Sequence, residues 1–139
     1  LTEARSRLHP IGCALSADIF AIVLSSPDDQ GIGQRPEDVS AIVDAVSPMV
    51  YPSHYSNGWL GFPDPNDYPG PVVADALDDG IPRLVDNTVM RPWLQAFYYD
   101  SSQVLAEIAE AEERGVGWIL WNAGGMYAES WLPPAVGEE

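Results

Sequence analysis

The sequence has no lysine, only two histidines and a single cysteine, Cys13. One cysteine cannot form a disulfide within the chain, and Cys13 with His9 and His54 offers fewer ligands than a structural zinc site takes. The phosphate-binding loops GxGxxG and GxxxxGK are also missing. We therefore expect neither a metal nor another cofactor. No run of about 18 apolar residues occurs, so no transmembrane helix is expected.

Acidic residues dominate the charged side chains of the sequence. Six arginines face 21 aspartates and glutamates, which gives a net charge of −15. Such a chain repels the phosphates of nucleic acids and the headgroups of anionic lipids, so neither a nucleic acid nor a membrane is expected as a partner. The simplest interpretation of this charge is a solubilising surface.

Short apolar segments alternate with helical patterns along the 139 residues. Four segments have the composition of buried strands, at 10–21, 46–51, 88–97 and 116–121. Helical patterns lie between them, at 36–46, 71–79 and 101–114. This alternation predicts one α/β domain over residues 1–139, with parallel strands in four βα units. Four units are half of a TIM (β/α)8 barrel, which needs about 250 residues, although a small open doubly wound sheet fits the pattern equally well.

Local signals add detail to this pattern. Asp100 and Gln103 have the spacing of a capping box, and Gly115 is expected to end the helix that follows. Pro48 would interrupt a sheet ladder, so it is expected where no ladder hydrogen bond is needed. The long segment 52–70 has five aromatic or histidine residues in a Gly, Pro and Asn background, which is typical of a functional loop.

Most carboxylates fall outside the predicted strands. We interpret them as solvated charge on loops and helices, at positions 64, 67, 75, 78, 79, 107, 110, 112 and 113. Asp18 differs, because it lies within the first predicted strand. Together with Ser16 it is expected near the C-terminal end of that strand.

Polar and aromatic residues gather where the predicted strands end, and the active sites of parallel α/β folds lie at that edge. Aromatic faces can stack on the C–H faces of a sugar ring while fixed donors and acceptors hold its hydroxyl groups, so this mixture suits a carbohydrate. Structural roles stay open for the same residues, since Asp18 can pair with Arg91 and the tryptophans can fill a core. The candidates are Asp18, Tyr51, His54, Tyr55, Arg91, Trp93, Gln95, Trp121 and Asn122.

Four segments of the sequence resemble one family. SADIFA (16–21), SPMVYPSHY (47–55), RPWLQAF (91–97) and GWILWNA (117–123) are similar to segments of the domain family DUF4015, whose members are regarded as glycosyl hydrolases. The resemblance implies a (β/α)8 barrel distantly similar to alpha-amylase-type hydrolases, of which this chain contains the C-terminal half. It also suggests a bacterial protein that is secreted or lies in the cell envelope. The family usually has an aspartate where this chain has Ala96, so one expected carboxylate is missing.

Glycoside hydrolysis takes two carboxylates, about 5 Å apart for retention or about 6.5–9.5 Å apart for inversion. We expect Asp18 to be one of them, with Arg91 and His54 as its catalytic neighbours, and the second to come from the missing N-terminal half-barrel. Two alternatives stay open: a carbohydrate-binding barrel without activity, and a half-barrel that assembles with a second copy of the chain. The expected substrate-binding residues are Tyr51, Tyr55, Trp93, Gln95, Trp121 and Asn122.

Overall fold

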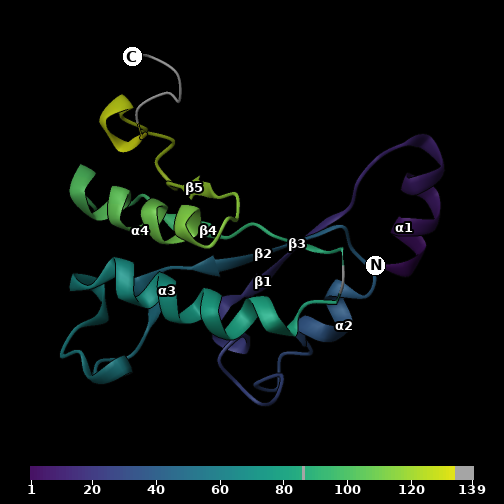
Figure 1. Ribbon diagram of the computed structural model, residues 1–139, viewed down its shortest axis with the longest axis horizontal. Helices are drawn as coiled ribbons and strands as arrows, with labels where there is room; N and C mark the ends of the chain where they lie inside the picture. The colour runs from purple at the N-terminus through teal and green to yellow at the C-terminus, as the bar shows by residue number, and fades with distance from the viewer. Residues whose placement is uncertain (86, 134–139) are drawn as a thin grey trace.

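The computed structural model describes residues 1–85 and 87–133. Its strands are all parallel and belong to one sheet in the order β1-β2-β4-β5, with β3 paired to the beginning of β2 (Figure 1). The predicted α/β class and parallel sheet are thereby confirmed. The strands are β1 (Ser16–Phe20), β2 (Ala45–Val50), β3 (Val89–Met90), β4 (Trp93–Gln95) and β5 (Ile119–Trp121).

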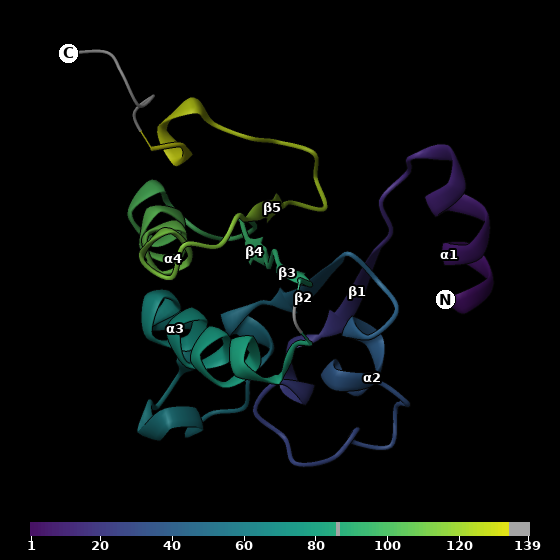
Figure 2. The same ribbon diagram turned by 45° about the vertical axis from the view of Figure 1, so that its right-hand side comes forward.

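Three helices connect the strands, and they lie on the same side of the sheet (Figure 2). They are α2 (Pro36–Ser40), α3 (Pro69–Gly80) and α4 (Ser101–Glu113), and a further helix, α1 (Thr2–Leu8), precedes β1. The capping box of Asp100 and Gln103 is confirmed at the start of α4. No helix among the described residues is long and apolar enough to cross a membrane. Short 3-10 turns occupy His9–Ile11, Ala21–Val23, Pro52–His54, Trp59–Gly61, Pro65–Asp67, Ile81–Arg83 and Glu129–Trp131.

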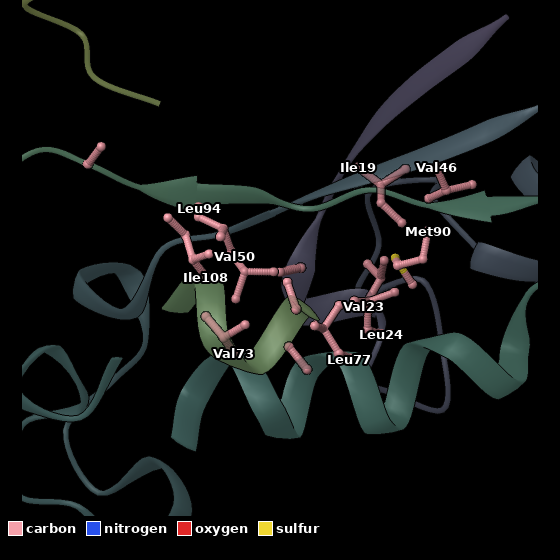
Figure 3. Packing of buried hydrophobic residues seen from close by; sticks show 14 of the residues in the cluster. Ile19, Val23, Leu24, Val46, Val50, Val73, Leu77, Met90, Leu94 and Ile108 are labelled. Atoms are coloured by element: carbon pink, nitrogen blue, oxygen red, sulfur yellow. The ribbon is translucent and has the colours of Figure 1, made fainter. Parts of the chain in front are cut away.

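A single hydrophobic core lies between the sheet and these helices (Figure 3). Alternate residues of the strands point toward it, because successive side chains of a strand face opposite sides. Each large aliphatic side chain that is fully buried in this way contributes about 1.5–3 kcal/mol. The sheet supplies Ile19, Val46, Val50, Met90 and Leu94, and the helices supply Val73, Leu77, Val104 and Ile108.

The other face of the sheet is open. Paired residues of parallel strands share a face, and the pairs Asp18–Ser47, Met49–Trp93 and Gln95–Trp121 all point away from the core. Phe20 and Trp121 remain 54% and 42% exposed there. The sheet is thus covered by helices on one side only.

The first strand and the first long helix are shorter than predicted. β1 begins at Ser16, so Ser16 opens the strand and Asp18 lies at its middle, and the expectation that both lie near its C-terminal end was wrong. The helix expected over 36–46 ends at Ser40. The last residues of the predicted helix belong to β2 instead. The backbone N–H of Asp44 donates to the carbonyl of Leu15 at 2.8 Å, and this bond starts the pairing of β2 with β1.

The strand expected over 88–97 is divided into β3 and β4. The register pairs Val46 with Met90 and Met49 with Trp93, so Pro48 and Pro92 fall in the interval between the two strands. Proline has no N–H to donate to a ladder, which explains the interruption. On the edge of β2 that faces β3 and β4, Pro48 therefore lies where no ladder bond is needed, as predicted.

Leu77 tests this core. Its side chain is fully buried in α3, so Leu77→Ala should lower the free energy of unfolding by about 2–5 kcal/mol, measured by urea denaturation. The control is Leu60→Ala, because Leu60 is 46% exposed and its loss should change stability by less than about 0.5 kcal/mol. Similar losses in the two variants would contradict the packing described.

Candidate functional site

Two hollows lie at the carboxyl edge of the sheet, and they share Tyr51 and His54. The first hollow has a volume of about 280 Å³ and the second about 500 Å³. The first is lined by Phe20, Ala21, Ile22, Met49, Tyr51, His54, Tyr55, Ser56 and Trp59. The second is lined by Tyr51, His54, Phe97, Tyr98, Trp121, Asn122, Ala123, Gly124 and Met126.

Aromatic contacts form the wall between the hollows. The ring of Tyr51 meets His54 and Phe97 edge-on, with centroids 5.3 and 5.4 Å away. Burial, with a smaller contribution from the charge of Asp18, raises the pKa of Tyr51 to about 12. Its hydroxyl is therefore neutral near pH 7 and can both donate and accept a hydrogen bond.

Gln95 fixes the loop that carries this wall. Its side chain is fully buried, and its oxygen accepts from the backbone N–H of Ser53 at 3.1 Å and from the Ser53 hydroxyl at 2.8 Å. Its amide nitrogen donates to Asn66 Oδ1 at 3.3 Å and to the carbonyl of Phe97 at 3.2 Å. Both ends of the amide are thus engaged by the protein, beneath the loop and outside the lining of either hollow.

Asp18 lies on the open face with the two tryptophans. Trp93 Nε1 donates to Asp18 Oδ1 at 2.9 Å, and the rings of Trp93 and Trp121 meet edge-on with centroids 5.8 Å apart. The structure therefore brings together three of the residues selected from the sequence. Trp121 extends this group into the second hollow.

Arg91 does not hold Asp18. The side chain of Arg91 is exposed, and none of the ion pairs within residues 1–85 and 87–133 includes it. The ion pair considered for Asp18 and Arg91 is therefore absent from the described residues, and the group that orients the carboxylate is the indole N–H of Trp93. A part for Arg91 in the site stays a prediction.

His54, Tyr55 and Asn122 lie at the hollows in different ways. His54 lines both and forms no hydrogen bond to Asp18 among the described contacts. Tyr55 packs its ring on Trp59 in the first hollow, and burial raises the pKa of its hydroxyl. Asn122 donates to the carbonyl of Ala96 at 2.6 Å and accepts from the N–H of Gly124 at 2.8 Å, so it shapes the turn beside the second hollow.

Carboxylates are scarce at this edge. No residue that lines either hollow is an aspartate or glutamate, and Asp18 is the one acidic residue in the described strands. Ala96 is fully buried within the hydrophobic core. A carboxylate at position 96 would therefore point toward the helices and away from the hollows.

Glu107 corrects one sequence prediction. It was expected to be solvated, but its side chain is fully buried on the face of α4 that also carries Val104, Ile108 and Ala111. Neither carboxylate oxygen has a hydrogen-bond partner of good geometry among the described residues. Burial raises the pKa of Glu107 well above its usual range, and the nearby backbone N–H of Gln95 opposes the shift in part. The spacing 104, 107, 108, 111 was the available signal, since it places Glu107 in the apolar stripe.

Three large side chains of the second hollow were not among the sequence candidates. Phe97, Tyr98 and Met126 line it, from the loops that follow β4 and β5. Their position just after strand ends was a usable signal, because loops at that edge line the sites of parallel α/β folds.

Comparison with known proteins identifies the family of the chain. A family model described as DUF4015, "putative glycosyl hydrolase domain", matches residues 1–127. The chain belongs to this family. The resemblance inferred from the sequence is thereby confirmed. No curated protein and no solved structure matches the chain.

The buried carboxyl of Glu107 makes stability depend on pH. A raised folded-state pKa means that the folded chain binds this proton more tightly than the unfolded chain. The contribution of this proton to the free energy of unfolding is therefore present below the unfolded pKa of about 4.3. It is lost as the pH rises toward the pKa of Glu107 in the folded chain. Compared with the wild type, Glu107→Gln should show a smaller decrease in the free energy of unfolding between pH 4.5 and pH 8, measured by urea denaturation.

Glu113→Gln is the matched control, because Glu113 is exposed on the same helix. This variant should keep the wild-type dependence on pH. Parallel pH profiles for the wild type and Glu107→Gln would show that Glu107 is charged in the folded chain.

Proposed function

We propose that the chain is half of a glycoside hydrolase-like barrel and that it binds a neutral carbohydrate in the second hollow. One observation supports this most directly: an aromatic and amide lining at the carboxyl edge of a parallel sheet, beside an aspartate oriented by Trp93. The volume of the second hollow falls within the range of roughly 300–1,000 Å³ that small-molecule sites have.

The strand order supports the barrel part of the proposal. The strands follow one another across the sheet in chain order, and every connecting helix lies on the same side. An open doubly wound sheet reverses its strand order at a switch point and carries helices on both faces. A (β/α)8 barrel does neither, because all of its helices form an outer ring. The N-terminal half of the proposed barrel, or a second copy of the chain, would cover the open face and the edges at β1 and β5.

The charge distribution supports a neutral ligand. The second hollow is lined by aromatic, amide and apolar side chains with His54, and it contains no arginine. Arg83 and Arg114 are bound to carboxylates, at 2.7 Å in each case, so they are not placed to neutralise an anionic ligand. A chain with a net charge of −15 would repel uronic acid or sulfated glycans.

Hydrolysis would require a second carboxylate. One carboxyl group donates a proton to the leaving oxygen and the other attacks the anomeric carbon or activates water. We propose Asp18 as one of the pair, because Trp93 orients one of its oxygens on the open face. The second would come from the N-terminal half of the barrel.

Binding without hydrolysis is the second candidate function. The absence of acidic residues from the described lining of both hollows favours it. In that case the same hollow binds the glycan, and Asp18 accepts a hydrogen bond from one of its hydroxyl groups. The two functions differ in whether a glycan that binds is also cleaved.

Trp121 should be essential for binding in either case. Calorimetry with soluble neutral oligosaccharides should show binding to the wild type, and Trp121→Ala should weaken it about tenfold or more, because an aromatic anchor is lost. Tyr68→Ala is the matched control, since Tyr68 is 40% exposed and lies outside both hollows. An oligosaccharide of uronic acids should bind more weakly than its neutral counterpart. Equal binding of both would contradict the neutral selectivity.

Asp18→Asn separates the two functions. In a protein that joins this chain to the N-terminal half of its family's barrel, the variant should lose at least about 99% of hydrolysis, as expected when an essential carboxylate is removed. It should still bind, because the amide oxygen can accept from Trp93 Nε1. Full hydrolysis by the variant would exclude Asp18 from the chemistry, whereas binding without cleavage by the unmodified protein would favour the second function.

A further inference from the structure

Tyr98 has an unusual conformation at the mouth of the second hollow. It follows β4 in the loop before α4, its side chain is 94% exposed, and its backbone φ is +64°. A large L-residue rarely adopts a positive φ, because its Cβ then crowds the backbone. Exposure of the ring also forgoes the stabilisation that burial would give.

A tyrosine is not the residue that the backbone at this position favours. Among the described residues, seven other positions with positive φ are glycines, and glycine would relieve the crowding here as well. Gln30, another residue with positive φ, is held by its own hydrogen bonds to Ser26 and Asp28. Tyr98 has no such local bond among the described contacts. Backbone strain of this kind is found mainly at functional sites.

The surroundings of Tyr98 indicate what its ring does. It lines the second hollow together with Trp121 and Met126. The ring of Phe97 meets it edge-on, with centroids 5.5 Å apart and planes at 86°, and Phe97 in turn contacts Tyr51. Contact with Phe97 supports the ring from one side and leaves most of its surface facing solvent.

We infer that Tyr98 is a specificity-determining residue that stacks on a sugar ring at the mouth of the second hollow. This inference rests on the proposed function. The axial C–H groups of a pyranose form an apolar face that packs on the negative face of an aromatic ring. The left-handed backbone places the ring where the ligand enters, and binding of the sugar recovers the burial that the free chain lacks. The ligand is an extended neutral glycan, with one ring held near Trp121 and a second ring at Tyr98.

The test compares stability with binding in the same variants. Tyr98→Gly relieves the backbone but removes the ring, so its melting temperature should equal or exceed that of the wild type while its affinity for a neutral oligosaccharide falls about tenfold or more. Tyr98→Ala should lose the same affinity, and Tyr98→Phe and Tyr98→Trp should keep affinity within about threefold. A disaccharide should be less sensitive to these changes than a longer oligosaccharide.

Leu60→Gly is the matched control. Leu60 also has a positive φ, of +54°, and lies outside the lining of both hollows, so this variant should gain stability without any change in affinity. If the wild type binds an oligosaccharide and Trp121→Ala weakens it while Tyr98→Gly does not, the role of Tyr98 is overturned and the proposed function stands. If the wild type binds no neutral oligosaccharide, the proposed function fails and the inference fails with it.

Discussion

The buried side-chain amide of Gln95 fixes the loop on which both hollows depend. The loop from β2 to α3 has only short 3-10 turns of its own, so its position depends on contacts with the rest of the fold. The oxygen of Gln95 holds Ser53 near its start and the nitrogen holds Asn66 near its end, where Tyr99 also donates to the Asn66 carbonyl at 3.0 Å. Losing one partner would leave a buried polar group unpaired, which costs about 1–3 kcal/mol. The loop can therefore present aromatic rings without collapsing onto the sheet.

The sheet that carries Gln95 is covered by helices on one side only. Parallel sheets are normally covered on both faces, because their connections place helices there or because they close into a barrel. Here the helix-covered face is packed with apolar side chains apart from the buried Glu107, whereas the open face carries Asp18 with Trp93 and Trp121. The hydrogen bond from Trp93 to Asp18 satisfies the indole N–H without water, which suits a face that the proposed barrel would enclose. The proposed barrel would account for both the uncovered face and the pairing of these polar groups.

The sequence was informative where local physics decides the outcome. The βα alternation predicted the parallel sheet, because connections through helices make neighbouring strands parallel, and the Asp100–Gln103 spacing predicted the capping box, because its two residues lie within one helical turn. Partners distant in the chain were not predictable in this way. Trp93 rather than Arg91 holds Asp18 because the sheet register brings β1 and β4 to β2 from opposite sides. Glu107 was misassigned because composition favours solvated glutamates, whereas its place in the apolar stripe of α4 decides its burial.

Two features that cost stability lie beside β4. The strained backbone of Tyr98 follows this strand, and the buried carboxyl of Glu107 lies behind it, near the backbone of Gln95. Natural sequences depart from local rules mainly where a function requires the departure, since selection removes costs that bring no benefit. The first hollow, formed by the ends of β1 and β2, has no residue with a positive φ in its described lining, although the buried Tyr55 hydroxyl and Trp59 Nε1 there lack a hydrogen-bond partner of good geometry among the described residues. Because both hollows are equally rich in aromatic residues, the strained backbone of Tyr98 is our reason for proposing the ligand site in the second hollow.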